Sequence, residues 1–310
     1  MTSTWIIAGA SGVVGRYVVK RLLAAGANLR LFSMSGRPHP DARVQVIRWD
    51  PEALSADPSS DLAPLIDALS GADVVLNLSG HSLGSGRLGR RHRHKVLQSR
   101  LDSTGVLVTA WQGAENRPQR WLQASAIGYY GDTGSDWVAE EAPCGSLYLS
   151  DVCRQWEQRV QPVLDAGCCT SVLRFGLILA PDAPAIVRML LPIRMGVGGR
   201  LGSGEQYWSW VTAEDVAAAI VHLAGCDHQG PVNLVAPGVV SQIDFTRAIA
   251  RLLKRPAFLN TPAAALRLAA GGAADELVLP SCRARADALL STGFEFQHAG
   301  LEQALPWLLR

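Results

Sequence analysis

Gly9-Ala10-Ser11-Gly12-Val13-Val14-Gly15 is the stretch of this 310-residue chain that decides its fold. A short apolar run, residues 5–9, leads into it, and apolar residues at helical spacing follow over residues 13–23. Three glycines between a strand and a helix are typical of a turn that binds a pyrophosphate, because backbone N–H groups and the positive end of the helix dipole face the anion. An ordinary glycine-rich turn is the alternative. The predicted dinucleotide contacts at this turn are Gly9, Ser11, Gly12, Val13, Val14 and Gly15.

Apolar runs and helical patterns alternate through the first 180 residues. Strands are expected over residues 28–32, 44–49, 73–78, 121–125 and 171–179, with helices near residues 62–69, 90–111 and 149–164. Strands that alternate with helices favour a parallel sheet covered on both faces. The sequence therefore predicts an α/β fold, a Rossmann-like doubly wound parallel sheet, over residues 1–180.

Glycine and proline interrupt this pattern after residue 180. Glycines crowd residues 196–204, and Trp208 and Trp210 follow closely. Helices are expected over residues 213–223, 241–253, 262–270 and 282–290, with one strand over residues 232–235. We predict a smaller mixed substrate lobe over residues 181–310, with part of residues 205–236 returning to the dinucleotide-binding domain.

Composition and charge exclude several classes of protein. Hydrophobic residues make up 48% of the chain and charged residues 18%, as in globular rather than disordered proteins. A net charge of +2 gives no general attraction to nucleic acid or to an anionic membrane. No apolar run reaches the roughly 18 residues that cross a bilayer, and the amino terminus lacks the basic start of a signal peptide. We therefore expect a cytoplasmic protein without a membrane partner.

Two local features bear on metal and nucleic-acid binding. The six cysteines show neither a CxxC motif nor zinc-ligand spacing to histidine, and His92 and His94 are expected on different faces of a helix, so we predict no metal site. Residues 87–100 form the densest basic run, but no aromatic residues are interleaved with them. A solvated helix that lends one arginine to a phosphate is the favoured interpretation, and nucleic-acid binding is the alternative.

The end of the second expected strand bears on the choice of dinucleotide. Sites for NAD place a carboxylate about 20 residues after the glycine turn to hold the ribose hydroxyls. Residues 31–37 hold no acid. Ser33, Ser35 and Arg37 can instead receive a 2′-phosphate, and Arg16 is a second cation beside the turn. We therefore predict NADP rather than NAD as the cofactor.

Several further stretches occur in one order along the chain. They are Asn77-Leu78-Ser79-Gly80, residues 124–131 (Ala-Ser-Ala-Ile-Gly-Tyr-Tyr-Gly), residues 152–157 (Val-Cys-Arg-Gln-Trp-Glu), residues 198–210 and residues 293–296 (Gly-Phe-Glu-Phe). Together with the glycine turn, they resemble the extended short-chain dehydrogenase/reductase superfamily, and more closely its atypical, epimerase-like NAD(P)-binding branch, sometimes labelled nucleoside-diphosphate-sugar epimerases. The resemblance covers nearly the whole chain. It implies a Rossmann-like domain, a small carboxy-terminal substrate lobe, and cofactor contacts from Leu78, Ser79 and Gly80.

The chain departs from that superfamily at the catalytic pair. The superfamily uses a tyrosine and a lysine four residues later, where the lysine lowers the tyrosine pKa and holds the cofactor ribose. No tyrosine of this chain has a lysine at that spacing, and alignment on Glu157 places Leu149 and Cys153 at the two positions. Ser125 and Tyr130 remain the candidate catalytic residues by resemblance, with turn capping and packing as the alternative.

The expected substrate is a small polar molecule held between the two lobes. His81, Gln206 and Trp208 are the candidate contacts, because an amide supplies hydrogen bonds and an indole supplies an apolar wall. Core packing of Trp208 and Trp210 is an equal alternative. The sequence thus predicts an NADP-dependent oxidoreductase or epimerase without the Tyr–Lys pair. The alternative is a non-catalytic NADP-binding sensor or regulatory protein.

Overall fold

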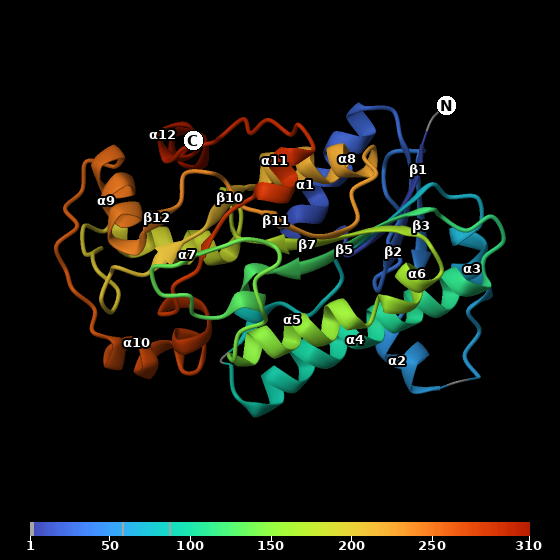
Figure 1. Cartoon of the computed structure of the whole chain (residues 1–310), viewed down its shortest axis with the longest axis horizontal. Helices are drawn as coiled ribbons and strands as arrows, with labels where there is room; N and C mark the ends of the chain where they lie inside the picture. The colour runs from blue at the N-terminus through green and yellow to red at the C-terminus, as the bar shows by residue number, and fades with distance from the viewer. Residues whose placement is uncertain (1–2, 58, 87) are drawn as a thin grey trace.

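A computed structural model describes residues 3–57, 59–86 and 88–310. Its centre is a parallel sheet of seven strands in the order β11-β7-β5-β4-β1-β2-β3 (Figure 1). The strands are β1 (Thr4–Ala8), β2 (Asn28–Ser33), β3 (Val44–Arg48), β4 (Val74–Asn77), β5 (Arg120–Ala126), β7 (Cys169–Phe175) and β11 (Gly230–Leu234). From β1 the chain builds first toward β3 and then back past β1 toward β11, so the predicted doubly wound, Rossmann-like sheet is confirmed.

Helices cover both faces of this sheet (Figure 1). One face carries α1 (Val13–Ala24), α8 (Ala213–Ala224) and α11 (Asp287–Ser291), and the other carries α3 (Ala63–Leu69), α4 (Arg90–Gly113) and α6 (Gln161–Asp165). The helices α2 (Pro51–Ala56) and α5 (Tyr148–Gln158) pack beside α4. Successive residues of a strand point to opposite faces, so β1 contributes to two cores. Trp5 and Ile7 pack with α1 and α8, whereas Ile6 and Ala8 pack with α3 and α4.

Smaller sheets and further helices extend beyond one end of the main sheet (Figure 1). The paired strands are β8 (Leu177–Leu179) with β10 (Trp210–Thr212), β9 (Tyr207–Trp208) with β12 (Val240–Ser241), and β6 (Trp137–Val138) with β13 (Arg283–Ala284). The helices are α7 (Pro184–Arg194), α9 (Gln242–Leu252), α10 (Ala263–Ala270) and α12 (Leu301–Leu308). A third core joins α7, α9 and α12 around Trp210 and Phe245, and this packing is the alternative that was left open for Trp210.

Residues 205–236 contribute to both parts of the molecule. β11 is the edge strand of the main sheet and pairs with β7, while α8 packs in the same core as α1. β9 and β10 belong to the smaller sheets instead. The chain therefore crosses between the two parts more than once, and a domain division near residue 180 stays a prediction.

Some predicted elements differ from the structure. The strand expected over residues 171–179 divides into β7 and β8 at Gly176, where a Cβ would lie 2.6 Å from the carbonyl oxygen of Ser209. The helix expected over residues 149–164 divides into α5 and α6, and Pro162 stands in the first turn of α6, where its missing N–H costs nothing. Within residues 282–290, β13 pairs with β6 and a helix begins only at Asp287, because a long-range strand pairing overrides the local helical pattern.

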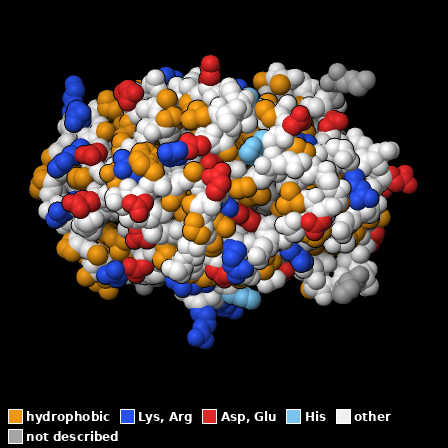
Figure 2. All heavy atoms as spheres, viewed as in Figure 1, with side chains coloured by type: hydrophobic (Ala, Val, Ile, Leu, Met, Phe, Trp, Pro, Cys, Tyr) orange, Lys and Arg blue, Asp and Glu red, His pale blue; other side chains and the backbone are white. Residues whose placement is uncertain are grey.

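Charges of both signs are scattered over the face shown in Figure 2. Lys and Arg side chains gather at its lower edge, where Figure 1 places the amino-terminal end of α4, which begins Arg-Arg-His-Arg-His-Lys. Arg87, the first residue of the basic run, lies outside the described residues. Over the described ranges, no helix is both long and apolar enough to cross a membrane. The same part of the chain brings no three His, Cys, Asp or Glu side chains together as metal ligands.

Candidate functional site

The glycine turn lies between β1 and α1, at the carboxyl edge of the main sheet. Gly9 has a φ of +87°, and a Cβ built on it would lie 2.7 Å from the carbonyl oxygen of Leu78. A Cβ on Gly15 would lie 2.5 Å from the carbonyl oxygen of Gly9. Backbone atoms therefore fill the space that a larger residue would need at either position, so these two glycines shape the turn.

Gly12 differs from the other two glycines of the motif. Its φ of −68° suits any residue, and a Cβ on it would meet only the Gly9 carbonyl oxygen, at 3.4 Å. Protein packing thus leaves the space beside Gly12 open. In the described part of the chain, the N–H groups of Val13, Val14 and Gly15 have no acceptor, and no side chain caps α1. An anion fits here because it would satisfy these donors and meet the positive end of the helix dipole.

Ser33, Ser35 and Arg37 lie together at the carboxyl end of β2. The two hydroxyl oxygens are 3.1 Å apart, and the Arg37 backbone N–H donates to Ser35 Oγ at 3.4 Å. A Cβ on Gly36 would lie 3.2 Å from the Arg48 Cβ, so the last residue of β3 lies against the same turn. Both arginine side chains are exposed. Arg48 was not predicted from the sequence, although the parallel pairing of Ser33 with Arg48 is the signal that places it there.

Arg16 is engaged within the protein. Its guanidinium donates to the carbonyl oxygen of Ser11 at 2.9 Å and pairs with Asp182, which lies before α7. Both side chains of the pair are about half exposed, and such surface ion pairs contribute little to stability. A phosphate would nevertheless compete with Asp182 for Arg16. Arg48 is therefore the better placed second cation.

Asn77 organises the turn that follows β4. Its buried amide donates to side chains of α4 and β5, and its Oδ1 accepts from the backbone N–H of Ser79 at 3.2 Å and from the Ser79 hydroxyl. The Leu78 N–H donates to the Ala8 carbonyl oxygen at 2.8 Å. These hydrogen bonds hold Leu78, Ser79 and Gly80 beside the glycine turn, which brings the predicted cofactor contacts of the two strands together.

His81 follows this turn and faces α4. Its backbone N–H donates to Ser99 Oγ at 2.9 Å, its Nε2 lies 3.0 Å from Ser85 Oγ, and its ring centre lies 5.3 Å from that of His92. Burial lowers the pKa of His81, and the positive charge of Lys95 adds to the effect. The imidazole is therefore mostly neutral at pH 7 and can hydrogen-bond a polar ligand as donor or acceptor.

Ser125 and Tyr130 belong to one buried polar network. Ser125 on β5 donates to Glu157 Oε1 on α5 at 2.6 Å, and Glu157 pairs with Arg174 on β7. Arg174 Nη1 donates to the Tyr130 hydroxyl at 2.9 Å. That hydroxyl in turn donates to Asn233 Oδ1 on β11 at 2.8 Å. The network thus ties β5, β7 and β11 to α5.

The network leaves neither hydroxyl proton free. Ser125 is 2% exposed and gives its proton to a carboxylate, and Tyr130 is 4% exposed. Burial raises the pKa of Tyr130 to about 12, in spite of the neighbouring Arg174 guanidinium. A buried phenol whose hydrogen bonds are already made is poorly suited to protonate a ligand. The geometry favours the packing alternative for both residues, and their catalytic roles stay a prediction.

The two positions aligned with the Tyr–Lys pair carry no acid or base. Leu149 and Cys153 are both buried on α5. Burial raises the pKa of the Cys153 thiol to about 12, so the thiol stays protonated. The Leu149 N–H donates to Glu276 at 3.1 Å, and Glu276 also pairs with Arg93 of α4. Glu276 therefore connects the first turn of α5 with α4 and with the carboxy-terminal part of the chain.

Gln206 precedes β9, and Trp208 is the last residue of that strand. The buried Gln206 amide donates to the carbonyl oxygens of Leu201 at 3.0 Å and Val278 at 3.1 Å. Trp208 packs edge to face against Phe245, with ring centres 5.7 Å apart, and its Nε1 has no partner among the described residues. Gln206 therefore holds the loop, whereas Trp208 keeps an unused donor. Substrate contacts from either residue stay a prediction.

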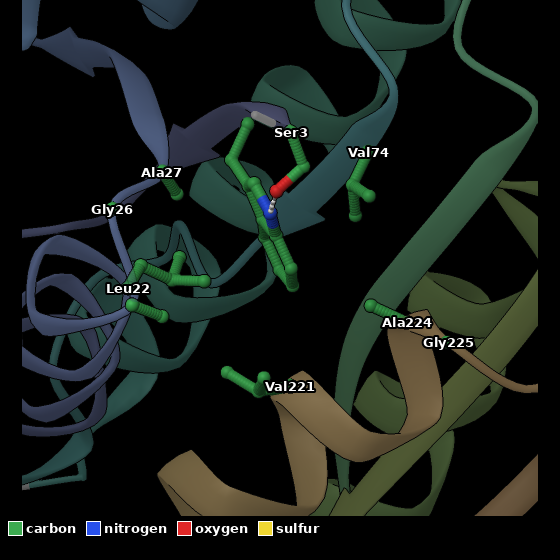
Figure 3. Close-up of a pocket in the computed structure, with 10 residues that line it drawn as sticks. Ser3, Leu22, Gly26, Ala27, Val74, Val221, Ala224 and Gly225 are labelled. Atoms are coloured by element: carbon green, nitrogen blue, oxygen red, sulfur yellow. Dashed lines mark hydrogen bonds between the residues drawn. The ribbon is translucent and has the colours of Figure 1, made fainter. Parts of the chain in front are cut away.

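A cavity of about 630 Å³ opens at the opposite, amino edge of the sheet (Figure 3). Trp5 and Val74 line it from β1 and β4, with Leu22 from α1 and Val221 from α8. Its lining holds no titratable side chain, and the Ser3 hydroxyl already accepts from Trp5 Nε1 at 3.2 Å. It lies at the other end of the strands from the glycine turn, so it is separate from the candidate site.

Comparisons with known proteins cover both parts of the chain. The model of the NAD dependent epimerase/dehydratase family matches residues 5–234, and a domain of unknown function, DUF1731, matches residues 261–308. The chain is 35% identical over 304 residues to the epimerase family protein ML0860 of Mycobacterium leprae, which is 97% of this chain and 94% of that protein.

Solved structures show the same arrangement. The crystal structure of the human epimerase family protein SDR39U1 (isoform 2) with NADPH matches with a TM-score of 0.83 and 25% identity, over 98% of each chain. The nucleoside-diphosphate sugar epimerase from Corynebacterium glutamicum matches with a TM-score of 0.73 and 26% identity, over 99% of this chain but 59% of that one. The likeness thus extends from the main sheet through the smaller lobe.

Proposed function

The chain belongs to the NAD dependent epimerase/dehydratase family, as its sequence resemblance predicted, and from this premise we propose that it is an NADP-dependent oxidoreductase or epimerase acting on a small polar substrate between its two lobes. The observation that carries the proposal is the open space beside Gly12, where the N–H groups of Val13, Val14 and Gly15 find no acceptor among the residues that the structure describes. A pyrophosphate bound there would supply the missing acceptors.

The end of β2 supports NADP over NAD. Arg37 and Arg48 are exposed beside the hydroxyls of Ser33 and Ser35, and residues 31–37 include no carboxylate. A 2′-phosphate would gain charge-assisted hydrogen bonds here, whereas the ribose diol of NAD would lack its usual acceptor. The human relative was solved with NADPH, which is consistent with this choice.

The substrate side of the proposal rests on His81 and Trp208. The first offers a neutral imidazole at the carboxyl edge, and the second has a buried indole N–H without an acceptor among the described residues. The bound nicotinamide would supply hydride chemistry, and the side chains would hold and orient the substrate. Because one structural relative is described as a nucleoside-diphosphate sugar epimerase, sugar nucleotides are the first substrates to test.

A non-catalytic NADP sensor is the second candidate, and a specific observation favours it. The hydroxyl groups of Ser125 and Tyr130 already donate to protein acceptors. The buried Leu149 and Cys153 occupy the positions where the superfamily has its acid–base pair. An enzyme with this arrangement that does not use Ser125 or Tyr130 takes its proton from His81, from water or from the substrate.

Cofactor titration followed by a substrate screen tests both candidates. We expect the purified protein to quench its tryptophan fluorescence on binding NADPH, and more weakly on binding NADH. Oxidation of bound NADPH by a member of a carbonyl and sugar-nucleotide panel would support the enzyme. Binding without turnover across the panel would favour the sensor, and failure to bind either dinucleotide would overturn the proposal.

A further inference from the structure

Arg100 is a partly buried cation with no carboxylate partner in the part of the chain that the structure describes. It lies on α4, and its Nη1 donates to the carbonyl oxygens of His81 at 3.0 Å and Val96 at 2.8 Å. Its guanidinium lies over the ring of Trp156, 4.9 Å from the ring centre. Both of these hydrogen bonds use Nη1. Among the described residues, Nε and Nη2 have no hydrogen-bond acceptor, and neither atom is fully buried. The N–H groups of Nε and Nη2 can therefore donate hydrogen bonds to a ligand.

The position of this guanidinium relates it to the predicted cofactor site. A Cβ on Gly80 would lie 3.1 Å from Arg100 Cζ, so the guanidinium covers the turn that follows β4. On its other side lies α5, where the positive charge of Arg100 acts to lower the pKa of Cys153 against the larger effect of burial. Arg100 thus lies between the turn after β4 and α5, the helix on which the alignment with the superfamily places the absent lysine.

An unpaired charge in such a place carries an energetic cost. Burial lowers the pKa of Arg100, yet arginine keeps its proton in proteins, so the cost falls on the folded state. The two carbonyl oxygens and the face of Trp156 offset part of it. Perturbed charged groups without a protein partner concentrate at functional sites, where a ligand supplies the missing partner.

We propose that Arg100 takes over the ribose-holding role of the absent lysine, by donating from its two free nitrogens to the hydroxyl groups of the nicotinamide ribose. The inference rests on the proposed dinucleotide site. A planar guanidinium with adjacent donors suits a pair of neighbouring hydroxyl oxygens better than the single ammonium of lysine does. Arg100 is then a cofactor-binding residue and leaves proton transfer to another group, because a guanidinium does not give up its proton.

Two probes that differ in the nicotinamide half test this role. NADPH carries the nicotinamide ribose, whereas adenosine 2′,5′-bisphosphate keeps the adenine ribose and its 2′-phosphate but lacks the nicotinamide half. The variants are Arg100→Met, which removes the charge, and Arg100→Lys, which keeps it. Arg91→Met, an exposed position on the same helix, is the matched control. Affinities for both probes are measured by fluorescence or calorimetry, with circular dichroism on each variant.

We expect Arg100→Met to weaken NADPH binding by about tenfold or more and adenosine 2′,5′-bisphosphate binding by less than about twofold. Arg100→Lys should lose an intermediate amount of affinity for NADPH and none for adenosine 2′,5′-bisphosphate. This second variant keeps the test valid if the Met variant does not fold. Arg91→Met should bind both probes as the wild type does.

Equal losses of affinity for both probes would show a structural role for Arg100 and overturn the proposal. Unchanged NADPH affinity in both Arg100 variants would also overturn it. A wild-type protein that binds neither probe would instead overturn the proposed function, and the role of Arg100 with it.

Discussion

The Glu157 carboxylate and the Arg174 guanidinium form a bidentate ion pair, with Nε 2.9 Å from Oε1 and Nη2 2.8 Å from Oε2. The two side chains are 15% and 4% exposed. Although burial opposes the charge, the contact with Glu157 raises the pKa of Arg174 above its ordinary value. The pair joins α5 to β7, so it fixes the helix face that carries Leu149 and Cys153 against the main sheet.

Arg174→Met should destabilise the protein strongly. The variant leaves the Glu157 carboxylate without its partner in a largely buried place, and breaking such a pair costs about 3–5 kcal/mol of unfolding free energy. Urea denaturation measures the change. Arg154→Met, which removes an exposed ion pair with Asp151, should show no measurable loss. An Arg174→Met midpoint equal to that of the wild type would contradict the structural role of the pair.

Tyr130→Phe should act on stability rather than on cofactor binding. It leaves Asn233 Oδ1 without a donor, so we expect a loss of about 1–2 kcal/mol in unfolding free energy and unchanged NADPH affinity. Once a substrate is found, its turnover should fall by less than about tenfold. A drop of about a hundredfold would instead restore Tyr130 as the general acid. Ser125→Ala provides the parallel measurement on the other end of the network.

Gly12→Val should abolish dinucleotide binding in a folded protein. The backbone at Gly12 accepts any residue and the nearest protein atom leaves room for a Cβ, so the added methyl groups fill the space expected for the pyrophosphate. Fluorescence titration and circular dichroism are recorded on the same sample. Gly225→Ala, at the end of α8, adds a side chain away from the turn and should bind NADPH normally. Full binding by a folded Gly12→Val protein would rule out the pyrophosphate site.

Arg37→Met and Arg48→Met should each reduce the preference for NADPH. Both remove a positive charge beside the expected 2′-phosphate, so NADPH affinity should fall by about tenfold while NADH affinity stays unchanged. Arg21→Met, an exposed position in the last turn of α1, is the control. Equal losses on both dinucleotides, or a wild-type preference for NADH, would refute the assignment of these arginines.

Cys153 should resist alkylation in the native protein. Since its pKa is raised to about 12, the reactive thiolate fraction at pH 8 is far smaller than for an ordinary thiol, and it increases only as the pH approaches that value. Mass spectrometry after iodoacetamide treatment should find the half-buried Cys226 labelled before Cys153. Unfolding in urea should remove the difference in labelling between the two cysteines. Rapid native labelling of Cys153 would show that this face of α5 is open.

Local sequence patterns were sufficient to predict the main sheet and the glycine turn. Residues 5–23 carry the apolar run, the glycines and the helical spacing in that order, so strand, turn and helix could be predicted from one short stretch. The break at Gly176 and the pairing of β13 with β6 could not, because each depends on backbone far away in sequence. Arg48 was missed for the same reason: it comes beside Ser33 only when β2 and β3 pair.

The sequence by itself determined the parallel sheet, the glycine turn, the lack of a carboxylate after the second strand and the absence of a Tyr–Lys pair. Each of these depends on residue types at short spacing, which the chain carries in any conformation. Only the tertiary structure decided that the Ser125 and Tyr130 hydroxyls make their hydrogen bonds within one buried network, and that the Arg100 guanidinium of α4 lies over the Trp156 ring of α5. Burial and charge pairing depend on distances across the fold, and spacing along the chain does not contain those distances.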